Sequence, residues 1–165
     1  MNTFLTDYYS YMESLARAHS EIGHSTAARH FFRGEVEEFF QQFRSEVRFP
    51  CLIVERSDNR YEGNIPLATV KSRQLSFIIA DSYDKHDDAD EVEAKMSRCE
   101  RIAEQVLGRM IADPDDDGSN PFIEVDTSTI EGQYLQNMQD RYVGYRLTLE
   151  VKEKVCLLNN SVWEQ

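Results

Sequence analysis

Carboxylates between Asp113 and Glu124 have the spacing of a calcium-binding loop. Asp113, Asp115 and Asp117 alternate, Gly118 follows them, and Glu124 stands at the twelfth position. Carboxylate oxygens are hard ligands that suit Ca²⁺, and the glycine allows the sharp turn that such a loop needs. The next residues, 122–127, read as a strand, although a calcium loop of this type requires an exiting helix. We therefore interpret the segment as an acidic turn and keep calcium binding as the alternative.

A second set of residues resembles the carboxylates of metal-dependent nucleases. Pro114-Asp115 and the later Glu150-Val151-Lys152 fit a pattern in which carboxylates hold Mg²⁺ and a lysine orients the nucleophile. Asp115 lies in an expected loop, however, and Glu150 and Lys152 are what the polar face of an amphipathic strand carries in any case. We expect no catalytic residue, no cofactor and no bound metal, and we interpret the protein as a non-enzyme.

Histidine and cysteine spacing indicates no zinc site. The candidate ligands or bases are His19, His24, His30 and His86. His19 lies on the apolar side of its predicted helix and is interpreted as a packed histidine, and His24 and His30 have no acidic or cysteine ligand at a zinc-like spacing. The cysteines are odd in number and far apart, without any C-x-x-C pair, and they are Cys51, Cys99 and Cys156. Buried free thiols are the simplest interpretation.

Net charge and hydropathy exclude two classes of partner. The chain has 30 acidic and 18 basic residues, which gives a formal net charge of −12, and the basic residues are scattered singly. Such a chain repels phosphate backbones, so we expect no direct, sequence-specific nucleic-acid binding. No apolar run approaches the roughly 20 residues that span a bilayer, and no basic, apolar leader opens the chain. We expect a cytoplasmic protein without a membrane partner.

Hydrophobic periodicity predicts helices first, then strands, one long helix and strands again. The helical period covers residues 3–21, 35–47 and 87–112, and the last has the clearest stripe. Strands are predicted at 51–56, 65–71, 75–81, 122–126 and 142–155, with a turn at Asp58-Asn59-Arg60. Residues 22–34 and 127–141 follow neither period. Within the first of these segments, the pair Phe31-Phe32 is a candidate for the core, as paired aromatic residues usually are, and an oligomer contact is the alternative hypothesis because the pair lies outside any clear helix.

This order of elements is typical of an α+β domain. We expect a mainly antiparallel sheet of about four to five strands with helices, one of them long, packed on one face. At 165 residues the chain suits a single domain, 1–165. Residues 1–48 would form a helical N-terminal region, and residues 49–156 would hold the sheet and the long helix.

Four segments between residues 49 and 152 resemble the tail-terminator, or tail-completion, proteins of long-tailed bacteriophages and prophages. Phe49-Pro50-Cys51-Leu52-Ile53-Val54-Glu55 opens the first strand after a helix, and Leu75-Ser76-Phe77-Ile78-Ile79-Ala80-Asp81 precedes an acidic gap. The long helix over residues 87–112 follows. Tyr142-Val143-Gly144-Tyr145-Arg146-Leu147-Thr148-Leu149 is the alternating strand after it.

The resemblance implies a structural protein of virion assembly. It would form a homo-oligomeric ring, with six subunits as the expected number. The ring would cap the tail tube, join it to the head connector and become part of the virion. No catalytic residues carry over. The alternative is an acidic protein-binding or regulatory module, with calcium bound through the Asp113–Glu124 loop.

Overall fold

A computed structural model describes residues 4–36, 46–62, 69–84, 88–112, 124–137 and 141–155. Its elements follow the chain in this order: α1 (Phe4–Ala18), β1 (Phe31–Arg33), β2 (Cys51–Val54), β3 (Asp58–Glu62), β4 (Thr69–Ser82), α3 (Ala89–Ala112), β5 (Glu124–Asn137) and β6 (Tyr142–Val155). None of the described helices is both long enough and apolar enough to cross a membrane.

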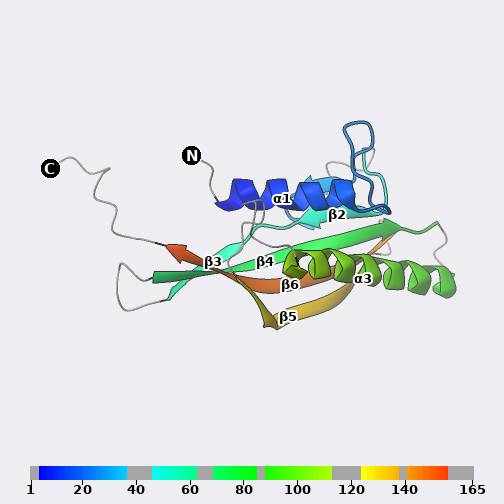
Figure 1. Ribbon diagram of the computed structural model, residues 1–165. Helices are drawn as coiled ribbons and strands as arrows, with labels where there is room; N and C mark the ends of the chain where they lie inside the picture. Colours follow the sequence, from blue (N-terminus) through cyan, green and yellow to red (C-terminus); the bar gives the residue numbers. More distant parts are fainter. Residues whose placement is uncertain are drawn as a thin grey trace.

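The strands form one sheet in the order β1-β2-β4-β6-β5 (Figure 1). Strand β4 pairs with β6 along its whole length on one side. On its other side it pairs with β3 near its start and with β2 near its end. All of these pairs are antiparallel, as is β5 with β6, and only β1 and β2 run parallel. The expected α+β fold with a mainly antiparallel sheet is confirmed.

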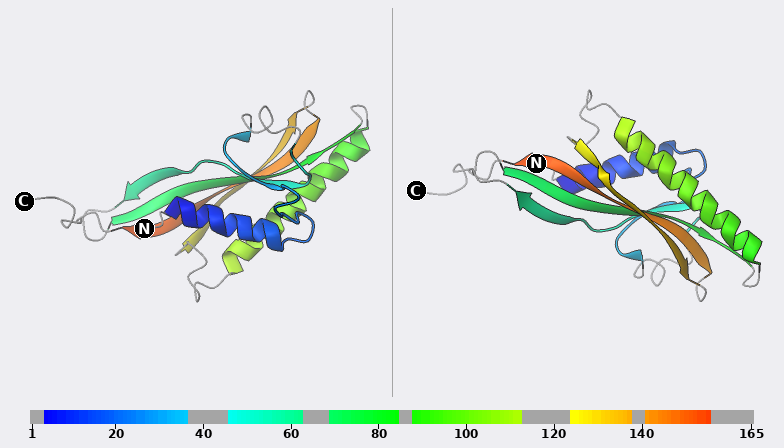
Figure 2. Two further views of the ribbon diagram at one scale, coloured as in Figure 1. Left: turned by 90° about the horizontal axis from the view of Figure 1, so that it is seen from above. Right: turned by 90° about the horizontal axis from the view of Figure 1, so that it is seen from below.

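Both described helices pack on the same face of the sheet. Tyr8 and Met12 of α1 and Ile102 of α3 join Phe77 of β4 in one buried cluster. Side chains alternate across a strand, so this face takes every second residue of β4 and β6. Figure 2 shows, from two opposite directions, how strongly these long strands twist beneath the helices.

Local signals explain where α3 begins. Asp88 precedes the helix, and its Oδ1 accepts a hydrogen bond from the Glu91 backbone N–H at 3.1 Å. This N-cap satisfies one of the donors that a helix start leaves unpaired. Asp90 and Glu91 in the first turn and Arg109 in the last complement the helix dipole. The predicted helix at 87–112 therefore agrees with the structure to within two residues.

The opposite face of the sheet is also apolar near β1 and β2. Phe32, Cys51, Ile53 and Ile78 form a second apolar cluster there, and Phe49 packs against it. The central strand is consequently apolar on both sides at this end, as its sequence predicts.

The alternative hypothesis of Phe31-Phe32 as an oligomer contact is wrong. Both residues lie in β1 and are buried, Phe31 beneath the helices and Phe32 in the second cluster. Their consecutive positions place them on opposite faces of the sheet. A three-residue strand is too short to show a period of two, so this strand could not be predicted from the residue pattern. The first 48 residues thus contribute a strand as well as a helix.

Two other segments differ from the prediction. Asp58-Asn59-Arg60, expected as a turn, begins β3, whose pairing with β4 outweighs the weak turn signal. The unassigned residues after 126 continue β5 to Asn137, with a register shift between Asp126 and Glu131. A bulge of this kind breaks the alternation that would have revealed the strand. Most of the helix predicted at 35–47 lies outside the described residues.

The buried position of Phe77 gives a direct test of this core. Replacing Phe77 by Ala should lower the free energy of unfolding by about 3–5 kcal/mol, because it removes a fully buried ring at the centre of the sheet. Urea denaturation followed by circular dichroism measures the change. Gln74→Ala, at an exposed site on the same strand, should change it by less than about 0.5 kcal/mol. If both substitutions lowered the free energy of unfolding equally, the central position of Phe77 in the core would be contradicted.

Candidate interaction surface

The sheet face opposite α1 and α3 carries an ion pair that spans three strands. Arg146 of β6 donates from Nε and Nη2 to the two carboxylate oxygens of Glu55, at 2.8 and 2.7 Å. Glu55 follows β2 directly, so the pair reaches across β4. Its carboxylate is buried, and two parallel bonds of this kind fix both position and orientation.

A polar row continues beside this ion pair. The Ser76 and Thr148 hydroxyls of β4 and β6 are 2.9 Å apart. A hollow of about 550 Å³ opens over the row, and its lining is almost entirely polar: Glu35, Glu55, Arg56, Asp58, Gln74, Ser76, Glu131, Gln133, Arg146 and Thr148. Four acids and two bases give this lining a net charge of −2. We call it the open face.

The Ser76 hydroxyl hydrogen-bonds to the Thr148 hydroxyl, which is no general base and cannot activate Ser76 as a nucleophile. Among the residues that the structure describes, no group of three or more His, Cys, Asp or Glu side chains is arranged to hold a metal ion.

On the helix side, a buried carboxylate connects the sheet to α3. Asp81 of β4 is 2% exposed and accepts hydrogen bonds from Lys95 at 3.2 Å and from Arg98 at 3.0 Å. Arg98 also donates to Glu21 at 3.0 Å, and Arg101 binds the same carboxylate at 2.7 Å. One chain of charges therefore links β4, α3 and the turn after α1, and its role is structural.

The described histidines make structural contacts, and the His30 backbone N–H donates to His24 Nδ1 at 3.2 Å. His19 lies just after α1, and its Nε2 is 3.0 Å from Gln105 Oε1. His24 lies 3.4 Å from Glu13, and His30 donates from Nδ1 to the Pro50 carbonyl at 2.8 Å. His86 lies outside the described residues.

Both described cysteines are buried free thiols, as expected. Burial raises the pKa of Cys51 well above its ordinary value and that of Cys99 to about 12. A thiol that stays protonated is a poor nucleophile and a poor metal ligand. Cys156 lies outside the described residues.

The residues singled out for metal chemistry are only partly described. Residues 113–123, which include Asp115, lie outside the described part of the chain. Glu124 opens β5, so a strand stands where a calcium loop would need its exiting helix. Glu150 and Lys152 lie on one face of β6, and Lys152 Nζ is 3.9 Å from Asp126 Oδ2.

Glu55, Arg146 and Asp81 were not predicted to form ion pairs. Glu55 and Arg146 are 91 positions apart, and only the strand order places them together. No family model and no curated protein matches this chain.

The hydrogen bonds between Glu21 and the arginines of α3 predict a lowered pKa for the Glu21 carboxyl, which can be measured. Hydrogen bonds from Arg101, and then from Arg98, lower the pKa of Glu21 to about 2 from its ordinary value of 4.5. A lowered pKa means that the folded state favours the charged carboxylate. This stabilisation is complete above pH 4.5 and is lost as the pH falls from there to about 2.

We expect Arg101→Gln to raise the pKa of Glu21 toward 4.5, as measured by NMR titration of its side-chain carboxyl. Arg17→Gln is the matched control, because Arg17 pairs with Glu13 instead. If the pKa of Glu21 were the same in both variants, the hydrogen bonds between Arg101 and Glu21 would be contradicted.

Because Glu124 opens a strand and not the helix that a calcium loop requires, we expect no calcium binding there. A site with micromolar affinity would stabilise the protein by about 4 kcal/mol at millimolar calcium. We expect the melting temperature to be the same in millimolar calcium and in a chelator. If calcium raised the melting temperature and Asp115→Asn abolished that rise, the alternative of a calcium-binding module would be supported instead.

Proposed function

We propose that this protein is a structural subunit of phage or prophage tail assembly. It forms a homo-oligomeric ring, of six subunits, that terminates the tail tube and joins it to the head connector. The observation that supports the proposal is the difference between the two faces of the sheet: α1 and α3 cover one face, and in the described part of the chain the other face carries an ordered polar surface.

The open face favours a binding role over an enzymatic one. Its central side chains are held by the Glu55–Arg146 pair and by the Ser76–Thr148 contact. Side chains already fixed in the free protein lose little conformational entropy when a partner binds. A polar surface of this kind is suited to a protein neighbour in an assembly.

The resemblance of residues 49–152 supports the tail-terminator assignment specifically. The segments that carry it form β2, half of β4, α3 and the first part of β6, which together make the centre of the sheet and the helix against it. The resemblance thus involves the core of the fold rather than isolated loops.

The net charge suits a ring through which DNA passes. Each subunit contributes −12, and the total grows with every copy in the ring. Negative walls repel the phosphate backbone, so DNA would move through without binding.

The mass in solution tests the proposal. We expect size-exclusion chromatography with light scattering, at two protein concentrations, to give a discrete species of six times the 19.2 kDa chain mass. Electron microscopy of that peak should show closed rings. A monomer at both concentrations that also fails to bind the ends of assembled tail tubes would contradict the proposal.

A further inference from the structure

Strand β5 forms one edge of the sheet. In the described part of the chain it pairs with β6 on one side and with no strand on the other. Its register with β6 is regular from Glu131 to Asn137, after the shift that begins at Asp126. Gly132 and Tyr134 are exposed within this regular part. A glycine has no side chain, so the exposure of Gly132 means that the backbone itself is accessible at this edge.

Backbone hydrogen bonds fix which groups of β5 point away from the sheet. The Glu55 N–H donates to the Ser76 carbonyl, so Ser76 of β4 directs its backbone groups toward Glu55 and away from β6. Its partner Thr148 then directs its own groups toward β5, where they meet those of Glu131. This direction alternates along an antiparallel strand. The residues of regular β5 whose N–H and C=O groups point outward are therefore Gly132, Tyr134 and Gln136.

This part of β5 carries little that would prevent further pairing. Charged side chains, Pro and very short strands commonly protect the edge of a sheet. Strand β1 has only three residues, and three of the five residues of β3 are charged. Residues 131–137 hold one charged side chain, that of Glu131, and no Lys or Pro. Regular β5 is thus the described edge best able to accept another strand.

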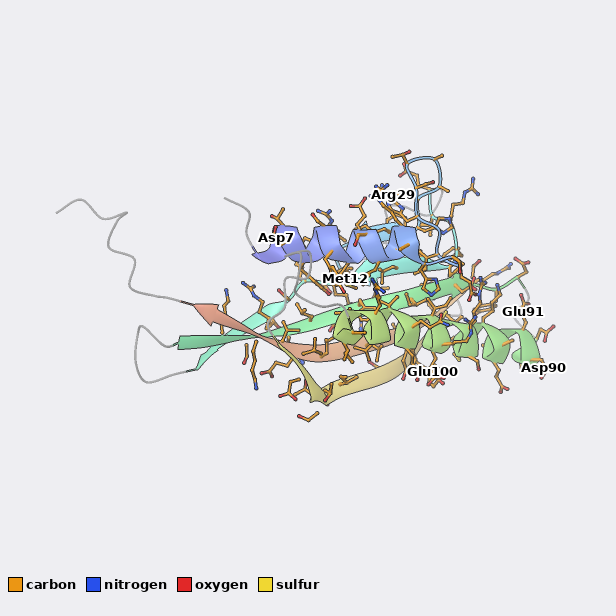
Figure 3. All side chains as sticks on the ribbon, viewed as in Figure 1. Asp7, Met12, Arg29, Asp90, Glu91 and Glu100 are labelled. Atoms are coloured by element: carbon orange, nitrogen blue, oxygen red, sulfur yellow. The ribbon has the colours of Figure 1, made fainter. Side chains whose placement is uncertain are left out.

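Two glutamates of α3 make this edge acidic. The Tyr134 hydroxyl donates to Glu100 Oε2 at 2.5 Å, and Figure 3 shows Glu100 on the side of α3 toward β5. That bond, burial and the charges of Glu100 and Glu104 raise the pKa of Tyr134 to about 12, so its hydroxyl stays a neutral donor. Within the described part of the chain, no Lys or Arg forms an ion pair with either carboxylate. The negative charge beside this edge is therefore uncompensated there.

The Tyr134 ring adds an exposed aromatic group to the edge. It is 50% exposed and packs edge-on against Tyr145, with 5.0 Å between the ring centres. A Cβ on Gly132 would collide with the Tyr145 ring, so the glycine lets Tyr145 lie close to the strand. Tyr134 is thus held by Tyr145 at its ring and by Glu100 at its hydroxyl. An exposed ring in a fixed position attracts the cationic groups of Lys and Arg side chains.

We propose that the outer edge of β5 binds an extended, basic segment of a partner protein, which adds a strand to the sheet. The outward N–H and C=O groups of Gly132, Tyr134 and Gln136 pair with the backbone of that segment. Side chains alternate across the added strand, so every second one lies on the helix side, next to Tyr134 and Glu100. A Lys or Arg at these positions compensates the charges of Glu100 and Glu104. The contact is separate from any contact between ring subunits, so it does not depend on the proposed function.

The same charges disfavour a second copy of this chain as the added strand. Antiparallel pairing of two β5 edges would place the helices of both copies on the same side of the joined sheet. Glu100 and Glu104 of one copy would then face the same residues of the other, and like charges repel each other. A basic partner meets no such repulsion.

Synthetic peptides of defined charge and pattern test this edge. The basic probe is a fluorescent peptide of about eight residues in which Lys and Thr alternate, long enough to cover the regular part of β5. We expect it to bind in about 0.05 M salt, where charges are weakly screened, as measured by fluorescence anisotropy. The same peptide with Glu in place of Lys should bind at least about 30-fold more weakly.

N-methylated versions of the basic probe show whether its backbone pairs with β5. Residues directly opposite each other in a sheet have side chains on the same face, so the Lys residues beside Tyr134 direct their N–H groups at β5. Methylating the Lys amides should weaken binding at least about 10-fold, because it removes these donors without changing the charge. Methylating the Thr amides, which point away from β5, is the matched control and should change the affinity less than about 2-fold.

Two variants of the protein each remove one feature of the edge. Glu100→Gln with Glu104→Gln removes the charge and should weaken binding of the basic probe at least about 10-fold. Gln136→Pro removes an outward N–H that forms no bond to β6, so the fold should tolerate it while binding weakens at least about 10-fold. Asp7→Asn with Asp90→Asn removes two acidic charges away from Glu100 (Figure 3) and should change the affinity less than about 2-fold. Circular dichroism shows whether each variant is folded.

Amide hydrogen exchange locates the contact on the strand. In the free protein, the amides of Gly132, Tyr134 and Gln136 should exchange faster than those of Gln133 and Leu135, which point toward β6. The basic probe should slow exchange at the first three.

Three outcomes would overturn the inference. The first is that the basic probe does not bind. The second is binding that Gln136→Pro and methylation of the Lys amides leave unchanged, which would be attraction to the net charge alone. The third is slow exchange of the outward amides without any peptide, lost in Gln136→Pro together with self-association, since a second copy would then cover the edge. The first two leave the proposed function standing, because the mass in solution tests the ring.

Discussion

The pairing of β4 with β6 is the constraint on which the rest of the fold depends. The two strands match residue for residue from Thr69 with Val155 to Ser82 with Tyr142. A shift by one residue would exchange the two faces and place the apolar side chains on the open face. At Gly144 a Cβ would lie 3.0 Å from the Ile79 carbonyl oxygen, so glycine permits the close approach of the two strands there. The register thus decides which residues form the core and which form the open face.

Asp81 of β4 connects the paired strands β4 and β6 to helix α3. A buried carboxylate is costly to desolvate, and it is tolerated here because Lys95 and Arg98 bind it directly. These two bases fix the rotation of α3 about its own axis. With its basic side held against the sheet and Glu21, the opposite side must turn toward β5. The exposure of Glu100 and Glu104 therefore follows from a contact on the other side of the same helix.

The strength of each local pattern determined how far the sequence predicted the fold. Strand β6 has the predicted bounds, Tyr142–Val155, because apolar and polar residues alternate throughout it. Strand β3 and most of β5 were not predicted, since Asp58-Asn59-Arg60 resembles a turn and the bulge after Asp126 interrupts the alternation. Contacts between residues far apart in the sequence could not be predicted, for a different reason. The pairing of Glu55 with Arg146 depends on the strand order, which no local pattern encodes.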